Sequence, residues 1–203
     1  MLGRYIVLEG GEGVGKTTQV ALLIEHLTDL GVKAEEMHEP GGDALGGVIR
    51  SLVLDPAYDV DLKTEVLLFN AARARAMIEV ERLLDSGIWV ISDRSYISTL
   101  AYQGYARGHD LDELETICLY AVGNTRPDLI LVLHCDSDET LNRRTGRGTT
   151  DRMEQAGEDF HAKVYNAFLD IAQRRSLPVI ETDGSKAEVF QWIWAHIKPL
   201  VEE

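Results

Sequence analysis

Short segments rich in apolar residues alternate along this chain with longer segments in which apolar residues recur every three or four positions. The short segments are typical of strands, most of them buried on both faces, and the longer ones of amphipathic helices. Such strands, separated by helices, indicate a parallel sheet covered on both faces. We therefore expect a three-layer α/β/α fold. Its five parallel strands are expected at residues 5–8, 32–38, 88–92, 128–134 and 178–181.

The helical pattern occupies the segments between these strands. One polar, glycine-containing break runs from Thr145 to Gly157 between two helices, and it predicts a mobile lid over about residues 143–157. Because there is no repeat or interdomain linker, residues 1–203 are expected to form a single domain. Helices are expected at residues 17–30, 45–52, 62–86, 95–105 and 110–123, from 137 into an arginine-rich stretch, at 160–171 and from 186 onward.

A glycine-rich loop with the pattern Gly-x-x-x-x-Gly-Lys-Thr follows the first expected strand at residues 10–17. Its glycines allow backbone dihedrals that other residues avoid, so successive N–H groups can turn toward an anion. The following helix adds the positive end of its dipole. Lys16 would reach the terminal phosphates of a nucleotide, and the Thr17 hydroxyl would ligate Mg²⁺. A loop of this kind between a strand and a helix predicts a nucleotide site.

Charged residues also follow the second and third expected strands. Glu39 comes after the second strand, and Asp93 and Arg94 come after the third. Because the carboxyl ends of parallel strands meet at one edge of a sheet, we expect these side chains beside the glycine loop. Asp93 is a candidate ligand for the metal. A helix N-cap is the alternative role for Asp93, since a helix is expected next.

The formal net charge of −14 argues against binding to nucleic acid or to an anionic membrane. A phosphate site must therefore gather its cations locally. An arginine that reaches a transferring phosphoryl group contributes about 10³ to 10⁵ in rate, so an arginine-rich lid has a clear use. The alternative for such a run is a solvated basic surface. The candidate cations are Lys16, Arg73, Arg94, Arg143, Arg144, Arg147 and Arg152.

Phe69 and Arg73 lie four residues apart and share one face of the expected long helix. An aromatic ring and a planar cation at this spacing could stack on a base and hydrogen-bond to its edge. Spacing alone favours a simpler interpretation, with Phe69 in the core and Arg73 exposed. Glu9 and Glu12, beside the glycine loop, are ambiguous in the same way.

Cysteine usage and the N-terminus bear on the compartment. Cys118 and Cys135 are far apart and have no histidine at ligand spacing, so we expect two buried free thiols in a reducing compartment. The N-terminus leads directly into a strand, with no evident signal peptide. No apolar stretch approaches the length of a membrane span. These observations favour a cytoplasmic protein.

Several motifs together resemble those of the thymidylate kinase family. The glycine loop is widely shared among NTP-binding proteins, whereas the Glu-Pro-Gly-Gly turn combined with Phe69, Arg73 and Ala-Tyr-Gln is much more specific. The likeness runs nearly from end to end. It is carried by Tyr5 to Thr18, Glu39-Pro-Gly-Gly42, Glu65-Val-Leu-Leu-Phe-Asn-Ala-Ala-Arg73, Asp93-Arg94, Ser98-Thr-x-Ala-Tyr-Gln-Gly104, Arg126-Pro-Asp-Leu129 and Arg147-Gly-x-x-Asp-Arg-x-Glu154.

The resemblance implies a P-loop NTPase-type fold that transfers the γ-phosphoryl group of ATP to dTMP, giving dTDP and ADP in dTTP biosynthesis. It implies Mg²⁺ as the cofactor, held by Thr17 and Asp93. The ATP-binding residues would be Gly10, Gly11, Glu12, Gly13, Val14, Gly15, Lys16, Thr17, Thr18 and Arg143. The dTMP-binding residues would be Glu39, Phe69, Arg73, Arg94, Thr99, Tyr102 and Gln103. The catalytic residues would be Lys16, Arg94, Arg147 and Glu12.

The family also implies individual roles at the acceptor site. The position of Phe69 stacks on thymine, that of Arg73 reads the base edge, and that of Thr99 binds the base ring. The position of Tyr102 lies against the sugar and disfavours ribose. The position of Arg94 binds the acceptor phosphate.

Other features of the resemblance concern the lid and the assembly. Glu12 matches an acidic position near the acceptor's sugar and phosphate. The arginines stand in the lid, as in the bacterial-type branch of the family, which makes Arg147 the best candidate for contact with the transition state. Many relatives have Tyr after the Asp-Arg pair, whereas this chain has Ser95 and then Tyr96, whose role is open. The family implies a homodimer with the long helix at its interface.

Alternative functions stay open. A kinase for dUMP or dGMP is one, because an aromatic ring and a threonine distinguish a thymine methyl by only about 1–3 kcal/mol. A GTPase-like switch is less favoured, because the Asn-Lys-x-Asp pattern is absent and Asn124-Thr-Arg-Pro-Asp128 does not replace it. A nucleotide-binding protein without activity is disfavoured by the intact Lys16, Thr17, Asp93 and Arg147.

Overall fold

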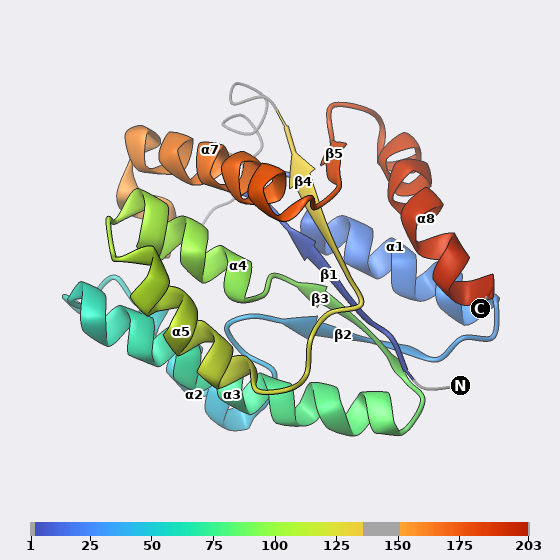
Figure 1. Ribbon diagram of the computed structural model, residues 1–203, viewed down its shortest axis with the longest axis horizontal. Helices are drawn as coiled ribbons and strands as arrows, with labels where there is room; N and C mark the ends of the chain where they lie inside the picture. The colour runs from blue at the N-terminus through green and yellow to red at the C-terminus, as the bar shows by residue number, and fades with distance from the viewer. Residues whose placement is uncertain (1–2, 136–150, 203) are drawn as a thin grey trace.

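Five strands form a parallel sheet in the computed structural model, which describes residues 3–135 and 151–202. The order across the sheet is β2-β3-β1-β4-β5 (Figure 1). The central strand β1 pairs with β3 on one side and with β4 on the other. The predicted five-stranded parallel sheet is confirmed. The strands are β1 (Tyr5–Glu9), β2 (Ala34–His38), β3 (Trp89–Asp93), β4 (Leu129–His134) and β5 (Val179–Glu181).

Helices cover both faces of the sheet, as expected. Figure 1 shows α1 and α8 together on one side of the strands, and α3, α4, α5 and α7 on the other, while α2 packs along α3. The α-helices are α1 (Lys16–Asp29), α2 (Ala44–Leu54), α3 (Leu62–Asp85), α4 (Tyr96–Thr99), α5 (Leu111–Val122), α7 (Glu158–Arg175) and α8 (Lys186–Glu202). Two further helical segments are η1 (Leu100–Ala106) and η2 (Glu154–Ala156).

The central strand divides the core into two layers. Tyr5 and Val7 pack with the helices on one face, and Ile6 and Leu8 pack with α1 and α8 on the other. This alternation follows from the two-residue period of a strand. Because both sets are apolar, β1 is buried on both sides, and its carboxyl end delivers the glycine loop to the sheet edge.

Side-chain caps begin several of the helices. Asp43 accepts the Gly46 N–H at 2.7 Å at the start of α2, and Asp61 accepts the Thr64 N–H at 3.0 Å at the start of α3. Asp110 does the same for α5, where the Glu113 N–H lies 2.9 Å away. Each cap satisfies a helix-end donor that has no partner within the helix. The polar residues between strands therefore define where the helices start.

One expected helix changes its geometry along its length. Residues 95–105 are helical, as expected, but α4 ends at Thr99 and a π-helical segment, η1, continues to Ala106. Apolar periodicity does not distinguish these geometries, and π-helical segments are frequent at functional sites. The helix expected from residue 137 and the lid arginines up to residue 150 lie outside the described residues. Within the part that the structure describes, no helix is long and apolar enough to cross a membrane.

Candidate active site

A cavity of about 380 Å³ opens at the carboxyl edge of the sheet. It lies where the glycine loop, the ends of β2 and β3, and the helices α2, α3 and η1 come together, with residues 151–154 on one side. Three strand ends therefore converge on one space, as the sheet topology predicts. The chemically relevant lining residues include Glu12, Lys16, Thr17, Glu39, Arg50, Phe69, Arg73, Asp93, Arg94, Thr99, Tyr102 and Gln103.

The glycine loop depends on small residues at two positions for different reasons. Gly15 has φ 94° and stands immediately before α1, a conformation that favours glycine. At Gly11 the constraint is space, because a Cβ atom would lie 2.0 Å from the Tyr165 ring on α7. Tyr165 also donates a hydrogen bond from its hydroxyl to the Glu12 carbonyl. Helix α7 therefore packs against the glycine loop through Tyr165.

Lys16 is buried at the base of the loop and reaches the cavity. Its Nζ donates to the carbonyl oxygens of Gly10, at 3.1 Å, and Gly11, at 2.8 Å. Burial and the nearby Arg94 lower the pKa of Lys16 from its ordinary value. The ammonium group is held by neutral carbonyls, which an incoming phosphate oxygen can replace.

Thr17 and Asp93 face each other at the end of β3. The Thr17 hydroxyl donates to Asp93 Oδ2 at 2.7 Å. The alternative role of Asp93 as an N-cap is wrong, because Ser95 caps α4 and accepts the Ile97 N–H at 3.3 Å. A hydroxyl and a carboxylate beside Lys16 are hard oxygen donors of the kind that Mg²⁺ prefers. The two residues therefore fit the metal that the sequence pattern implies.

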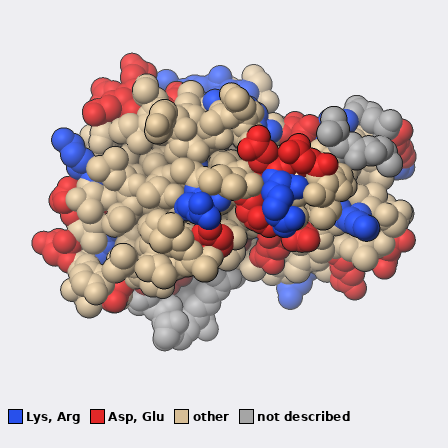
Figure 2. Space-filling view, turned by 90° about the horizontal axis from the view of Figure 1, so that it is seen from below, with Lys and Arg blue, Asp and Glu red and all other residues tan. Residues whose placement is uncertain are grey.

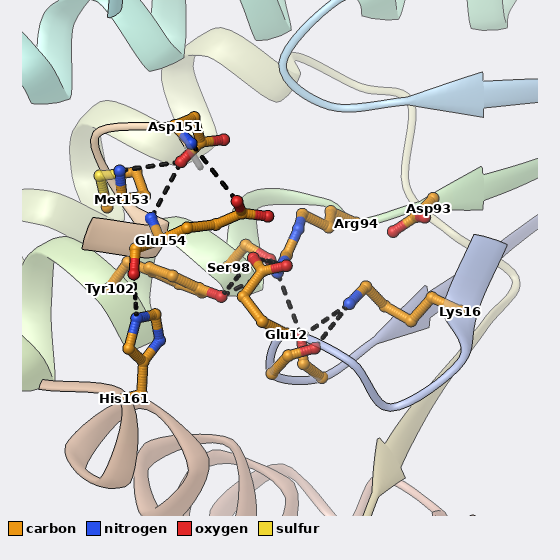
Figure 3. A network of polar contacts seen from close by, with 12 residues as sticks. Glu12, Lys16, Asp93, Arg94, Ser98, Tyr102, Asp151, Met153, Glu154 and His161 are labelled. Atoms are coloured by element: carbon orange, nitrogen blue, oxygen red, sulfur yellow. Dashed lines mark hydrogen bonds and ion pairs between the residues drawn. The ribbon is translucent and has the colours of Figure 1, made fainter. Parts of the chain in front are cut away.

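Arg94 occupies the centre of a charged network (Figure 3). Its backbone has φ 82°, unusual for a residue with a side chain. One guanidinium nitrogen, Nη1, donates to the Gly10 carbonyl at 3.1 Å and to Ser98 Oγ at 3.0 Å. The other, Nη2, donates to the Glu12 carboxylate and to the Tyr102 hydroxyl, the latter at 3.1 Å. Arg94 therefore connects the glycine loop to the segment that follows β3.

Glu12 is the acidic partner of this network. Its carboxylate accepts from Arg94 and from the Tyr102 hydroxyl, the latter at 3.0 Å. Burial acts to raise the pKa of Glu12, but the charges of Arg94 and Lys16 outweigh it and lower that pKa to about 2. Glu12 is therefore ionised at neutral pH and balances the two cations.

Glu9 is a buried carboxylate whose role the sequence left ambiguous. It accepts the N–H and hydroxyl groups of Ser95, at 2.7 and 2.8 Å, and those of Ser98, at 3.1 and 2.7 Å. Burial raises the pKa of Glu9, while Arg94 and the serine hydroxyls oppose that shift. The same Ser98 hydroxyl contacts Arg94. Glu9 thus links the end of β1 to the start of α4, and through Ser98 it helps to hold Arg94 in place.

Arg73 lines the cavity and is buried, at 2% exposure. Its Nε donates to Glu39 at 2.6 Å, and Nη2 donates to Thr99 Oγ1 at 2.9 Å. Burial raises the pKa of Glu39, although the Arg73 charge opposes the shift. The spacing-based expectation of an exposed Arg73 is therefore wrong, because the turn after β2 supplies it with a buried partner.

Phe69 also departs from the expectation based on spacing. Its ring is half-buried and lines the cavity instead of packing in the core. Tyr102 and Gln103 line the cavity from η1, and the Arg94 guanidinium lies 5.1 Å from the centre of the Tyr102 ring. All seven residues predicted for the acceptor nucleotide border this one cavity: Glu39, Phe69, Arg73, Arg94, Thr99, Tyr102 and Gln103.

Glu12, Gly13, Gly15, Lys16, Thr17 and Asp93, predicted for ATP and the metal, also line this cavity. Val14 is buried in the core, while Thr18 is exposed and borders a second hollow between α1 and α8. Arg143 and Arg147 lie outside the described residues. Tyr96 does not line the cavity; its hydroxyl accepts a hydrogen bond from Arg175 Nη1 on α7 at 3.1 Å.

Arg50 is a cation of the cavity that the sequence analysis missed. It lies on α2, and its Nη1 donates to the Pro40 carbonyl at 2.9 Å, within the turn that also carries Glu39. Asp151, Met153 and Glu154 also line the cavity; they fall within the expected lid but were not predicted as site residues. Arg50 stands on an ordinary amphipathic helix with no local motif, so a single sequence offered no signal for it.

A glycine loop after β1, a threonine and an aspartate beside its lysine, and a parallel sheet define a P-loop NTPase-type protein. The comparisons with known proteins go further. The family described as Thymidylate kinase matches residues 8–193. A thymidylate kinase of Carboxydothermus hydrogenoformans is 41% identical, covering 94% of each chain. Those of Deinococcus radiodurans and Caldicellulosiruptor saccharolyticus are 40% and 34% identical, covering 96% and 100% of both chains. The chain belongs to the thymidylate kinase family.

Proposed function

We propose that this protein transfers the γ-phosphoryl group of ATP to dTMP, giving dTDP and ADP. The observation that carries the proposal is the meeting of Lys16 and Arg94 on one carbonyl. Both side chains donate to Gly10 O, each at 3.1 Å. A donor phosphate held by Lys16 and an acceptor phosphate held by Arg94 would therefore be adjacent. Phosphoryl transfer requires this approach, since catalysis depends mainly on positioning and on positive charge.

The glycine loop is the proposed donor site. Its N–H groups and the start of α1 would bind the ATP phosphates, and Lys16 would leave the loop carbonyls to contact the terminal ones. Thr17 and Asp93 would hold Mg²⁺, which when bound neutralises charge on the phosphates. Arg143 and Arg147 are part of the proposal for the donor nucleotide and for the transferring group, respectively, and they lie outside the described residues.

The cavity beyond Arg94 is the proposed acceptor site. Phe69 offers a half-exposed ring on which thymine could stack, and Arg73 with Thr99 offers donors at the base edge. Arg73 is pre-oriented by Glu39, so binding the base requires little reordering. Tyr102 borders the proposed sugar position. Arg94 would bind the acceptor phosphate, and Glu12 keeps its guanidinium in place.

We also propose that the protein is a homodimer that associates through α2 and α3. These helices pack side by side and expose large apolar side chains: Leu45, Val48 and Leu52 on α2, and Leu67 and Ile78 on α3. Figure 2 shows this side of the molecule, where residues other than Lys, Arg, Asp and Glu form a broad surface. Large exposed apolar side chains gathered on two neighbouring helices favour association with a second copy.

A cytoplasmic location is the last part of the proposal. Cys118 and Cys135 are both buried, and Cys118 is a free thiol, as expected in a reducing compartment. The proposed substrates, ATP and dTMP, are nucleotides of that compartment.

Initial rates with a panel of acceptors test the proposed reaction. ATP and Mg²⁺ are supplied with dTMP, dUMP or dGMP, and ADP release is followed. We expect dTMP to give the highest kcat/KM, and Lys16→Ala to abolish turnover while the far-UV circular dichroism stays unchanged. A clear preference for dUMP or dGMP would show that dTMP is not the preferred acceptor. Retained turnover in Lys16→Ala would place the donor site elsewhere.

A further inference from the structure

Glu65 is a fully buried carboxylate that does not line the cavity. It stands in the first turn of α3, and its partners come from two distant parts of the chain. Gln103 Nε2 donates to Oε1 at 2.7 Å, and Arg107 Nε forms an ion pair with the same oxygen at 3.0 Å. Arg152 Nη2 forms an ion pair with Oε2 at 2.5 Å. A carboxylate so deeply buried is stable only with such partners.

Arg152 links Glu65 to the end of α2 as well. Its Nε and Nη2 donate to the Val53 carbonyl at 3.0 and 2.9 Å, and its backbone N–H donates to the Leu54 carbonyl at 2.9 Å. These two carbonyls belong to the last turn of α2, where helix acceptors have no partner within the helix. The position of residue 152 is therefore fixed by the backbone and by the side chain together.

The neighbours of Arg152 face the other way, into the cavity. Asp151, Met153 and Glu154 line it, and we call residues 151–154 the wall segment. Asp151 Oδ1 accepts the N–H groups of Met153 and Glu154, both at 2.9 Å, which gives the segment a defined turn. Figure 3 shows the Glu154 side chain extending toward Arg94 and Glu12. The Arg152 side chain thus binds Glu65 and the end of α2, and it holds in place a segment whose other side chains line the cavity.

We propose that Glu65 is a positioning residue of the acceptor site. Through Arg152 it fixes the wall segment, and through Gln103 it fixes η1, which carries Tyr102. Two parts of the cavity lining that are far apart in the sequence therefore depend on one buried carboxylate that does not itself line the cavity. The proposal rests on the assignment of this cavity to dTMP, and it adds a residue that organises the cavity before any nucleotide binds.

Kinetics of Arg152→Met test the proposal, since this change removes the charge but keeps much of the side chain's length. We expect kcat/KM for dTMP to fall by about 10- to 100-fold, while KM for ATP changes by less than about twofold. Arg152→Lys keeps a charge for Glu65 but loses the paired contacts of Nε and Nη2 with the Val53 carbonyl, and an intermediate loss is expected. Equal effects on the two substrates would overturn the proposal.

Arg175→Met is the matched control. Arg175 also joins separate elements, donating to Tyr96 at 3.1 Å and to Glu115 at 2.7 Å, but it lies away from the cavity. We expect the kinetic constants of Arg175→Met to stay within about twofold of those of the wild type. If Arg175→Met and Arg152→Met lower kcat/KM for dTMP alike, general destabilisation explains both, and the positioning role is refuted.

Amide hydrogen exchange of the nucleotide-free protein separates this inference from the proposed function. In Arg152→Met and in Glu65→Gln, a peptide covering residues 151–157 should exchange at least about tenfold faster than in the wild type, with no change in Arg175→Met. Unchanged exchange in Arg152→Met would refute the anchor even if Glu65→Gln failed to fold. If the wild type did not phosphorylate dTMP, the proposed function would fail, while this exchange result would still decide whether Glu65 and Arg152 hold the segment.

Discussion

Arg94 shows how single residues organise the proposed reaction. A residue with a side chain at φ 82° carries backbone strain of about 1–3 kcal/mol, and such strain persists only where the surroundings enforce it. Here Glu12, Tyr102, Ser98 and the Gly10 carbonyl all accept from the guanidinium. These contacts orient the cation toward the cavity before a phosphate arrives, so its reorganisation on binding is small.

Phe69 gives the sharpest prediction at the scale of one side chain. Phe69→Ala should weaken the binding of dTMP by roughly 5- to 150-fold, because stacking on an aromatic ring contributes about 1–3 kcal/mol per base. ATP affinity should be unchanged, since the ring lies on the acceptor side. Isothermal titration with each nucleotide measures both, and Tyr120→Ala, at an exposed site on α5, serves as the control. If the substitution weakened the binding of both nucleotides equally, Phe69 would not be part of the acceptor pocket.

Glu12 predicts a specific dependence of stability on pH. Its pKa falls from 4.5 to about 2 on folding, so its ionised form stabilises the folded state above pH 4.5, and this stabilisation is lost as pH falls toward 2. Glu12→Gln removes the contribution. Urea unfolding at about pH 6 and about pH 3 should show a larger difference between wild type and variant at the higher pH. A difference that grows on acidification would contradict the lowered pKa.

Helix α7 acts at the next scale, as a support for the glycine loop. Its Tyr165 ring occupies the space where a side chain at Gly11 would stand. Gly11→Ala should therefore displace the loop and lower kcat by at least about tenfold, since misplacement of phosphate-binding groups is costly. Steady-state kinetics measure the loss, and adding Tyr165→Ala should recover part of the kcat by making room.

Gly47→Ala is the control for that substitution. Gly47 lies within α2, and a Cβ atom there meets nothing within 4 Å. Alanine should stabilise the helix by about 0.5–1 kcal/mol and leave kcat unchanged. If Gly11→Ala behaves like Gly47→Ala, the contact with Tyr165 does not constrain the loop.

The elements also show what a single sequence can and cannot predict. The five strands and the glycine loop were predicted because apolar runs and glycine spacing are local signals. Burial of Arg73 was not, since its partner Glu39 lies 34 positions away and spacing within one helix contains no information about it. Arg50 and the anchor of Arg152 were missed for the same reason. The π-helical turn was missed because its apolar periodicity resembles that of an α-helix.

At the scale of the whole molecule, the exposed apolar face of α2 and α3 predicts the assembly. Ile78→Asp places a charge on this face and should shift the protein from dimer to monomer in analytical ultracentrifugation, because burying an unpaired charge is unfavourable. Leu30→Asp, at an exposed apolar residue following α1, should leave the dimer intact. A monomeric wild type at micromolar concentration would contradict the proposed homodimer.

The molecule carries a net charge of −14 and yet gathers Lys16, Arg50, Arg73 and Arg94 around one cavity. Four cations at one site can contact two phosphorylated ligands, although carboxylates such as Glu12, Glu39 and Asp93 line the same cavity. Both ligands must then occupy neighbouring positions in the same space. Phosphoryl transfer between them depends on that proximity.

Titration with adenosine and thymidine joined through a chain of five phosphates tests it most directly. If the two sites meet at Lys16 and Arg94, one linked molecule should bind per chain, more tightly than ATP or dTMP alone, and should prevent dTMP from binding. Lys16→Ala and Arg94→Ala should each weaken it. If dTMP still binds at full affinity to protein saturated with the linked nucleotide, the two sites are separate, and the account is contradicted.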